Sequence, residues 1–126
     1  NSIGQKASIE ALTGDQTCVE DMKSLFLKRR DLIVELLNDL PGVKCANPKG
    51  AFYVFPDFSS YLNQKVNGKL LKDTFDISEY ILDSVKVVTV PGDGFGARGH
   101  IRFSYATNRK IIQEGMNRVK KALEMI

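Results

Sequence analysis

The residue best suited to chemistry in this sequence is an arginine in the middle of a predicted strand. Ile101, Phe103 and Tyr105 alternate with a second set of smaller or polar residues, which are Arg102, Ser104 and Ala106. Alternate residues of a strand point to opposite faces, so Arg102 lies opposite a large apolar face. A guanidinium has five donors in one plane and favours a carboxylate or phosphate partner. Arg102 is therefore either a solvated edge-strand arginine or the binding residue for such an anion.

A glycine-rich loop precedes this strand. Val87–Val90 is a β-branched run that predicts a buried strand, Pro91 ends it, and the four glycines from Gly92 to Gly99 can take positive φ. A dinucleotide-binding or P-loop motif needs its glycines to open a helix, whose amides hold the phosphate. Here the glycines lead into a strand. We interpret the loop as a turn that lets the backbone approach another surface.

The sequence lacks the residues that other catalytic or metal-binding chemistry would need. His100 is the only histidine, and no motif places it near a serine with an orienting acid, as a hydrolase triad needs. Cys18 and Cys45 lie far apart without a CxxC spacing, so a zinc site would need further ligands, and we predict no metal site. We expect two reduced thiols, with one disulfide as the alternative.

The composition is that of one globular domain. The 126 residues are 43% apolar and 26% charged, enough for a real core. The net charge of +3 is small and charges of both signs are interspersed, which argues against a nucleic-acid partner. No apolar run approaches the roughly 20 residues that span a bilayer, and there is no signal-peptide profile. We therefore expect a cytoplasmic protein with no membrane partner.

Two helices are predicted in the first third of the chain. Residues 1–13 have a short helical pattern ended by Gly14. A second, longer helix is predicted from Asp15, as its N-cap, to Leu40 before a Pro-Gly stop. Its length exceeds what a small domain needs, which a helix running from one domain into the next would explain. Within it, Arg29-Arg30-Asp31 is most simply a solvated face.

Short strands and two more helices follow. Asn47–Gly50 fits a type I turn before an apolar strand at 51–55, with 43–46 as a candidate edge strand. Residues 56–75 predict a loop with one helical turn near 59–62. Asp76 with Glu79 resembles a capping box opening a helix, and the last helix follows Asn108 as N-cap. The inward faces predicted for these two helices are Ile77, Tyr80, Ile81 and Val85, then Ile112, Met116, Val119, Leu123 and Ile126.

These elements predict an α+β fold. A small mixed sheet of three to four strands is covered on one face by the long N-terminal helix and the C-terminal helix. The face with Ile101, Phe103 and Tyr105 should meet those helices. The Arg102 face is then left for another body to cover.

The loop and strand together resemble a known family. VVTVPGDGFGARGHIRFSYA, residues 87–106, resembles the C-terminal signature of the class I aminotransferases, fold type I enzymes that use pyridoxal phosphate. Further similarities are Pro48-Lys49-Gly50-Ala51-Phe52-Tyr53, which resembles a Pro-x-Gly-Ala-Phe-Tyr motif, Gln5-Lys6-Ala7, and Arg29-Arg30-Asp31. The resemblance runs through essentially the whole chain, but only to the last third of such an enzyme.

The resemblance implies a division of roles. Residues 1–13 would be a remnant of the upstream large domain, and 14–126 the small C-terminal domain. Arg102 would bind the substrate's α-carboxylate, and the Gly50-Ala51 end would lie toward the active-site cleft. The parent enzyme would be an aspartate or aromatic type aminotransferase, a homodimer acting on an amino acid and a 2-oxo acid. Lys6 and Lys49 do not have the family's Ser-x-x-Lys context, so we expect the chain alone to bind no cofactor and to be inactive.

Two alternatives remain open from the sequence. One is another fold type I enzyme, such as a C–S lyase or an aminocyclopropane-carboxylate synthase, which would share the carboxylate arginine. The other is a freestanding module that binds carboxylates or another protein.

Overall fold

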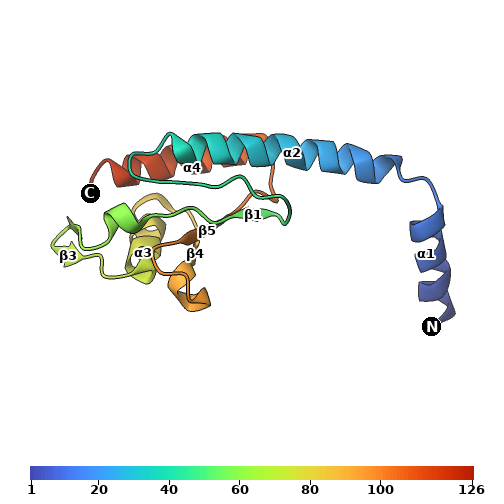
Figure 1. Cartoon of the computed structure of the whole chain (residues 1–126), viewed down its shortest axis with the longest axis horizontal. Coiled ribbons are helices and arrows are strands. Elements are labelled where there is room, and N and C mark those ends of the chain that lie inside the picture. Colours follow the sequence, from blue (N-terminus) through green and yellow to red (C-terminus); the bar gives the residue numbers. More distant parts are fainter.

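The computed structural model describes residues 1–126 as helices around a small sheet (Figure 1). The α-helices are α1 (Ser2–Thr13), α2 (Thr17–Asn38), α3 (Thr74–Val85) and α4 (Arg109–Leu123). The strands are β1 (Tyr53–Val54), β2 (Lys65–Val66), β3 (Lys69–Leu70), β4 (Val90–Pro91) and β5 (Ile101–Ser104). Two short 3-10 helices are η1 (Ser59–Tyr61) and η2 (Gly92–Phe95). The α+β class is confirmed.

Strand β5 is the centre of the main sheet. The order is β1-β5-β4, and both pairings are antiparallel. Backbone bonds extend the contact with the first strand beyond β1: the Tyr105 amide donates to the Phe52 carbonyl at 2.9 Å, and the Ile101 amide to the Pro56 carbonyl at 3.1 Å. This ladder fixes which side chains of β5 face inward.

The core lies between the sheet and two helices. Ile101, Phe103 and Tyr105 are buried, as their alternation predicts. Helix α2 contacts α4, and Figure 1 shows the two running alongside each other on one side of the sheet. Their buried residues are Leu32, Ile33 and Leu37 from α2, and Ile112, Met116, Val119, Ala122 and Leu123 from α4. The two predicted covering helices are confirmed.

The N-terminal part of the chain stands apart from this core. Helix α1 has no buried residue, and Figure 1 shows it hanging from the far end of α2. The first half of α2 projects past the sheet, so Val19, Met22 and Leu25 remain about half exposed although they continue the apolar stripe. No helix is long and apolar enough to cross a membrane.

The helices themselves were predicted correctly, but the predicted N-terminal residues of two of them were wrong. The Asp15 carboxylate accepts a bond from the Thr17 amide at 3.0 Å, yet the N-cap position of α2 is Gln16. Helix α3 begins two residues before the expected Asp76, because the Asp73 side chain caps it by accepting from the Asp76 amide at 3.0 Å. Asn108 caps α4 as predicted.

The strands differ more from expectation. The strand predicted at 51–55 is only Tyr53–Val54, because Ala51 takes a left-handed φ of 66° in place of a type I turn ending at Gly50. The 43–46 edge strand reduces to one bridge between Lys44 and Asp57, and 87–90 pairs only from Val90. The β2–β3 hairpin within 56–75 was missed, although its tip, Asn67-Gly68, is a strong hairpin signal.

Both cysteines are free. Cys18 is exposed and Cys45 is buried, so the expectation of two reduced thiols is confirmed. Burial disfavours the thiolate and raises the pKa of Cys45 to about 11.

Candidate functional site

The sheet register places Arg102 beside aromatic residues. Tyr53 pairs with Ser104, and Val90 with Arg102, so these four residues share the sheet face that points away from α2 and α4. Tyr53 is therefore a diagonal neighbour of Arg102 across the β1–β5 pair. The alternation that buries Ile101 and Phe103 turns Arg102 outward.

Two aromatic rings lie against the Arg102 guanidinium. Its Cζ lies 5.2 Å from the centroid of the Tyr53 ring and 5.1 Å from that of Phe95. Both distances are within the range of cation–π attraction. The two rings themselves remain accessible, at 44% exposure for Tyr53 and 59% for Phe95. Arg102 thus lies against two side chains that form an open surface.

The charge of Arg102 has no partner in this chain. None of the ion pairs and none of the side-chain hydrogen bonds involves its guanidinium. The rings supply apolar contact and cation–π attraction but accept no conventional hydrogen bond. Its N–H donors therefore remain free. Such an arrangement can bind a planar anion, and a carboxylate matches the guanidinium fork with two parallel bonds.

The tight turn η2 places Phe95 beside Arg102. A Cβ at Gly92 would lie 2.3 Å from the His100 carbonyl oxygen and 2.6 Å from that of Ala97, so the close approach requires glycine. Gly96 then ends the turn with a φ of 73°, which glycine adopts readily. The loop does bring backbone into close approach, but to the chain's own next turn and not to another surface as predicted.

Asp93 connects this turn to α3. Its carboxylate accepts a hydrogen bond from the Thr74 amide at 2.9 Å and another from the Thr74 hydroxyl. The Thr74 hydroxyl oxygen accepts in return from the Asp93 amide at 3.1 Å. These bonds lower the pKa of Asp93 from its ordinary value, with a smaller contribution from the charge of Arg98. Sequence analysis had assigned Asp93 no role, because its partner lies on a different element.

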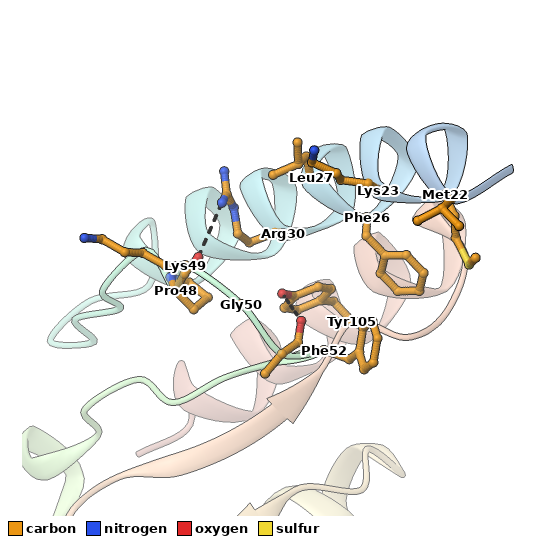
Figure 2. Close-up of a pocket in the computed structure, with 12 residues that line it drawn as sticks. Met22, Lys23, Phe26, Leu27, Arg30, Pro48, Lys49, Gly50, Phe52 and Tyr105 are labelled. Carbon is orange, nitrogen blue, oxygen red and sulfur yellow. Dashed lines mark hydrogen bonds between the residues drawn. The ribbon is translucent and has the colours of Figure 1, made fainter. Parts of the chain in front are cut away.

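An apolar groove lies on the other side of the sheet. It has a volume of about 320 Å³ between α2 and residues 48–52, and Arg102 does not line it. Figure 2 shows Phe26 of α2 facing Phe52 and Tyr105 within it. The ring centroids of Phe26 and Phe52 are 5.0 Å apart. Gly50 and Ala51, expected near an active-site cleft, line this groove.

The prediction of a solvated face at residues 29–31 was wrong for both arginines. Arg30 donates to the Pro48 carbonyl at 3.3 Å and to the Asp31 carboxylate at 2.7 Å, and its side chain is only 20% exposed (Figure 2). The Arg29 guanidinium lies 5.0 Å from the centroid of the Phe26 ring. Both arginines are drawn inward because residues 48–52 and the Phe26 ring pack against this side of α2.

His100 has structural contacts. Its Nδ1 lies 3.1 Å from the Arg98 carbonyl oxygen, and its ring packs against Phe55. The nearest acid is Asp57, whose pKa is lowered first by hydrogen bonds from Ser59 and then by the charge of His100. No group of three or more histidine, cysteine or acidic residues is arranged to hold a metal ion.

Comparisons with known proteins agree with the geometry. Residues 1–119 match the family described as aminotransferase class I and II. The chain is 42% identical over 127 residues to a probable aspartate/prephenate aminotransferase from Aquifex aeolicus, covering 99% of this chain and 31% of that protein. The chain thus spans less than a third of the length of this curated relative.

Solved structures show the same fold. The aspartate aminotransferase from Rhizobium meliloti superimposes with a TM-score of 0.95 at 36% identity, covering 99% of this chain and 32% of that one. The aspartate aminotransferase from Thermus thermophilus, solved with maleate, superimposes with a TM-score of 0.81 at 34% identity. That match covers 97% of this chain and 30% of the Thermus chain.

Proposed function

Because this chain belongs to the aminotransferase class I and II family, we propose that residues 14–126 are the small domain of a pyridoxal-phosphate aminotransferase whose Arg102 binds the substrate α-carboxylate. The parent enzyme would transfer an amino group between an amino acid, of aspartate or aromatic type, and a 2-oxo acid. The observation that carries the proposal is the Arg102 guanidinium, which lies against two rings and is left without an acidic partner.

The surroundings of Arg102 support a carboxylate ligand over a structural ion pair. An arginine that served stability would be matched by an acid of its own chain, as the exposed Arg118 is by Glu114. Both amino acid and 2-oxo acid carry an α-carboxylate, so one arginine can hold either substrate in the same place. The Thermus aspartate aminotransferase that superimposes on this chain was solved with maleate, a dicarboxylate.

The chain supplies the substrate end of such a site and does not fit the cofactor by itself. Pyridoxal phosphate provides an electron sink when it is joined to a lysine amine. Every lysine of this chain is exposed, and none stacks on or pairs with the residues around Arg102. We infer that a large domain of the parent enzyme holds the cofactor and faces Arg102. After pyridoxal phosphate and borohydride treatment, the 126-residue chain alone should then show no single lysine that is modified selectively and stoichiometrically, and such a modification of one lysine would contradict this.

Substitution of Arg102 in the full-length enzyme tests the carboxylate role. Arg102→Ala removes a charged partner from the ligand carboxylate, which costs roughly 2–5 kcal/mol. We expect kcat/KM to fall about 30- to 4000-fold at about 1.4 kcal/mol per decade. Arg102→Lys should recover only part of the loss, because an ammonium keeps the charge without the planar fork.

A control separates this role from a structural one. Arg109→Ala removes an exposed arginine that makes no ion pair, and both its kcat/KM and its Tm should remain near those of the unmodified enzyme. The Tm of Arg102→Ala should also change little, since its side chain points away from the core. Wild-type kcat/KM in Arg102→Lys would contradict the proposal.

A further inference from the structure

Turn η2 has a single polar side chain to fix it. Three of the residues at and just after the turn are glycines, Gly92, Gly94 and Gly96, which have no side chain to pack. The remaining two are Asp93 and Phe95, and Phe95 is 59% exposed. Glycine-rich segments lose the most conformational freedom when they are ordered. Backbone hydrogen bonds hold the turn itself, and Asp93 makes the side-chain hydrogen bonds that attach it to another element.

Asp93 contacts an immobile part of the fold. Thr74, its partner, is completely buried at the start of α3. The contact is reciprocal: the carboxylate accepts from the Thr74 amide and hydroxyl, and the Asp93 amide donates to that hydroxyl oxygen. Helix α3 is held in turn by packing against α4 and β4. The bonds between Asp93 and Thr74, which we call the clamp, anchor η2 to the helical layer.

The clamp determines where one wall of the arginine site lies. Phe95 is two residues beyond Asp93 in the same turn, and its ring covers one face of the Arg102 guanidinium at 5.1 Å. The other ring against Arg102, that of Tyr53, is fixed differently, by the pairing of β1 with β5. Only the Phe95 wall depends on a side-chain contact made outside the sheet.

We propose that Asp93 is a positioning residue for Arg102: by clamping η2 to Thr74, it holds Phe95 against the guanidinium and so keeps the N–H fork aimed at the substrate carboxylate. This inference rests on the proposed carboxylate role of Arg102. Without the clamp, Phe95 leaves the guanidinium face for part of the time and Arg102 samples more rotamers. Binding of the ligand must then restrict the arginine to one rotamer, and the conformational entropy lost in doing so weakens binding.

The experiment measures maleate affinity by titration calorimetry in the full-length enzyme. Asp93→Ala should raise the Kd for maleate about 3- to 30-fold, the scale of coupling through packed neighbours. The matched control is Asp73→Ala. Asp73 is another carboxylate at the start of α3, which caps the helix but makes no hydrogen bond to η2. Asp73→Ala should lower the Tm while leaving the Kd unchanged. An equal rise of Kd in both variants would mean that helix stability, not the clamp, sets the affinity, and would overturn the proposal.

Two further variants test the route through Phe95. In a Phe95→Ala background, Asp93→Ala should add little to the Kd, because the wall that it positions is already absent. Fully additive effects would overturn the proposal. Thr74→Val should weaken maleate binding by removing the hydroxyl of the clamp, and Thr74→Ser, which keeps it, should restore affinity. Arg102→Ala is measured alongside. If it leaves the Kd unchanged, the proposed function itself fails, whereas a large effect there with none from Asp93→Ala rejects only the positioning role.

Discussion

At the scale of single residues, the site consists of a charge and the groups that orient it. Arg102 could be proposed as an anion-binding residue from its place in a strand, but Tyr53 and Phe95 could not be placed beside it, because β1 and η2 bring them in from elsewhere in the chain. Asp93 is a similar case. Its carboxylate is recognisable as a clamp only once Thr74 is seen at the start of α3. Residue type and alternation predict which side chain faces out, but not which neighbours surround it.

The lowered pKa of Asp93 predicts a pH dependence. Because the folded-state pKa lies below the ordinary value of 3.8, the ionised form is favoured by folding. Its contribution to stability is therefore present above pH 3.8 and is lost as the pH falls through the folded-state pKa. The free energy of unfolding of Asp93→Asn should lie below that of the unmodified chain at pH 6, and the two should converge on acidification. Urea titrations across this range test it, and a gap that stays constant down to pH 2.5 would refute the assignment.

At the scale of elements, the two faces of strand β5 have different roles. Its inward residues form the centre of the core, while Arg102 on the outward face belongs to the site. The candidate site thus rests directly on the core residues beneath it. An arginine on a loop would need other means to keep its orientation, whereas here the backbone of Arg102 is paired on both sides.

Substitution of Ile101 tests this dependence on the core. Ile101 is fully buried, so Ile101→Ala should lower the free energy of unfolding by about 2–5 kcal/mol. The matched control is Ile111→Ala, which removes the same atoms from a residue that is 53% exposed. It should change the stability by no more than about 0.5 kcal/mol. Chemical denaturation of both variants provides the comparison, and similar losses in the two would contradict the placement of β5.

The helices were predictable from the sequence and the strands largely were not. An apolar stripe repeated over three or more turns identifies α2, α3 and α4 and their buried faces. The strands pair over only two to four residues, a length at which long-range contacts decide the pairing. Val87 and Val88 illustrate the limit, since they have the composition of a buried strand but lie outside the paired segment. The missed β2–β3 hairpin is different, because the Asn67-Gly68 turn signal could have been recognised in the sequence.

At the scale of the whole molecule, apolar surface is concentrated away from the core. Ile3 and Leu12 of α1 are about 80% exposed, and the groove between α2 and residues 48–52 is lined mainly by apolar side chains. Figure 1 shows that α1 and the first half of α2 extend beyond the sheet. Exposed apolar side chains gathered in this way are typical of interaction sites.

This surface predicts self-association of the isolated chain. Sedimentation velocity should show a sedimentation coefficient that increases with protein concentration, because a second copy can cover the apolar residues. Met22→Glu with Leu27→Glu places charges in the groove and should reduce the association, whereas Glu114→Gln on the exposed side of α4 should not. A chain that stays monomeric at millimolar concentration would contradict the expectation.

The measurement that tests the central claim most directly is a crystal structure of the full-length enzyme with maleate bound. The account predicts one maleate carboxylate in the plane of the Arg102 guanidinium, between Tyr53 and Phe95. Its two oxygens should lie about 2.7–2.9 Å from guanidinium nitrogens, the range of charge-assisted hydrogen bonds. A maleate held elsewhere, for example beside Arg30 in the apolar groove, with Arg102 still against its two rings and bound to no carboxylate, would contradict it.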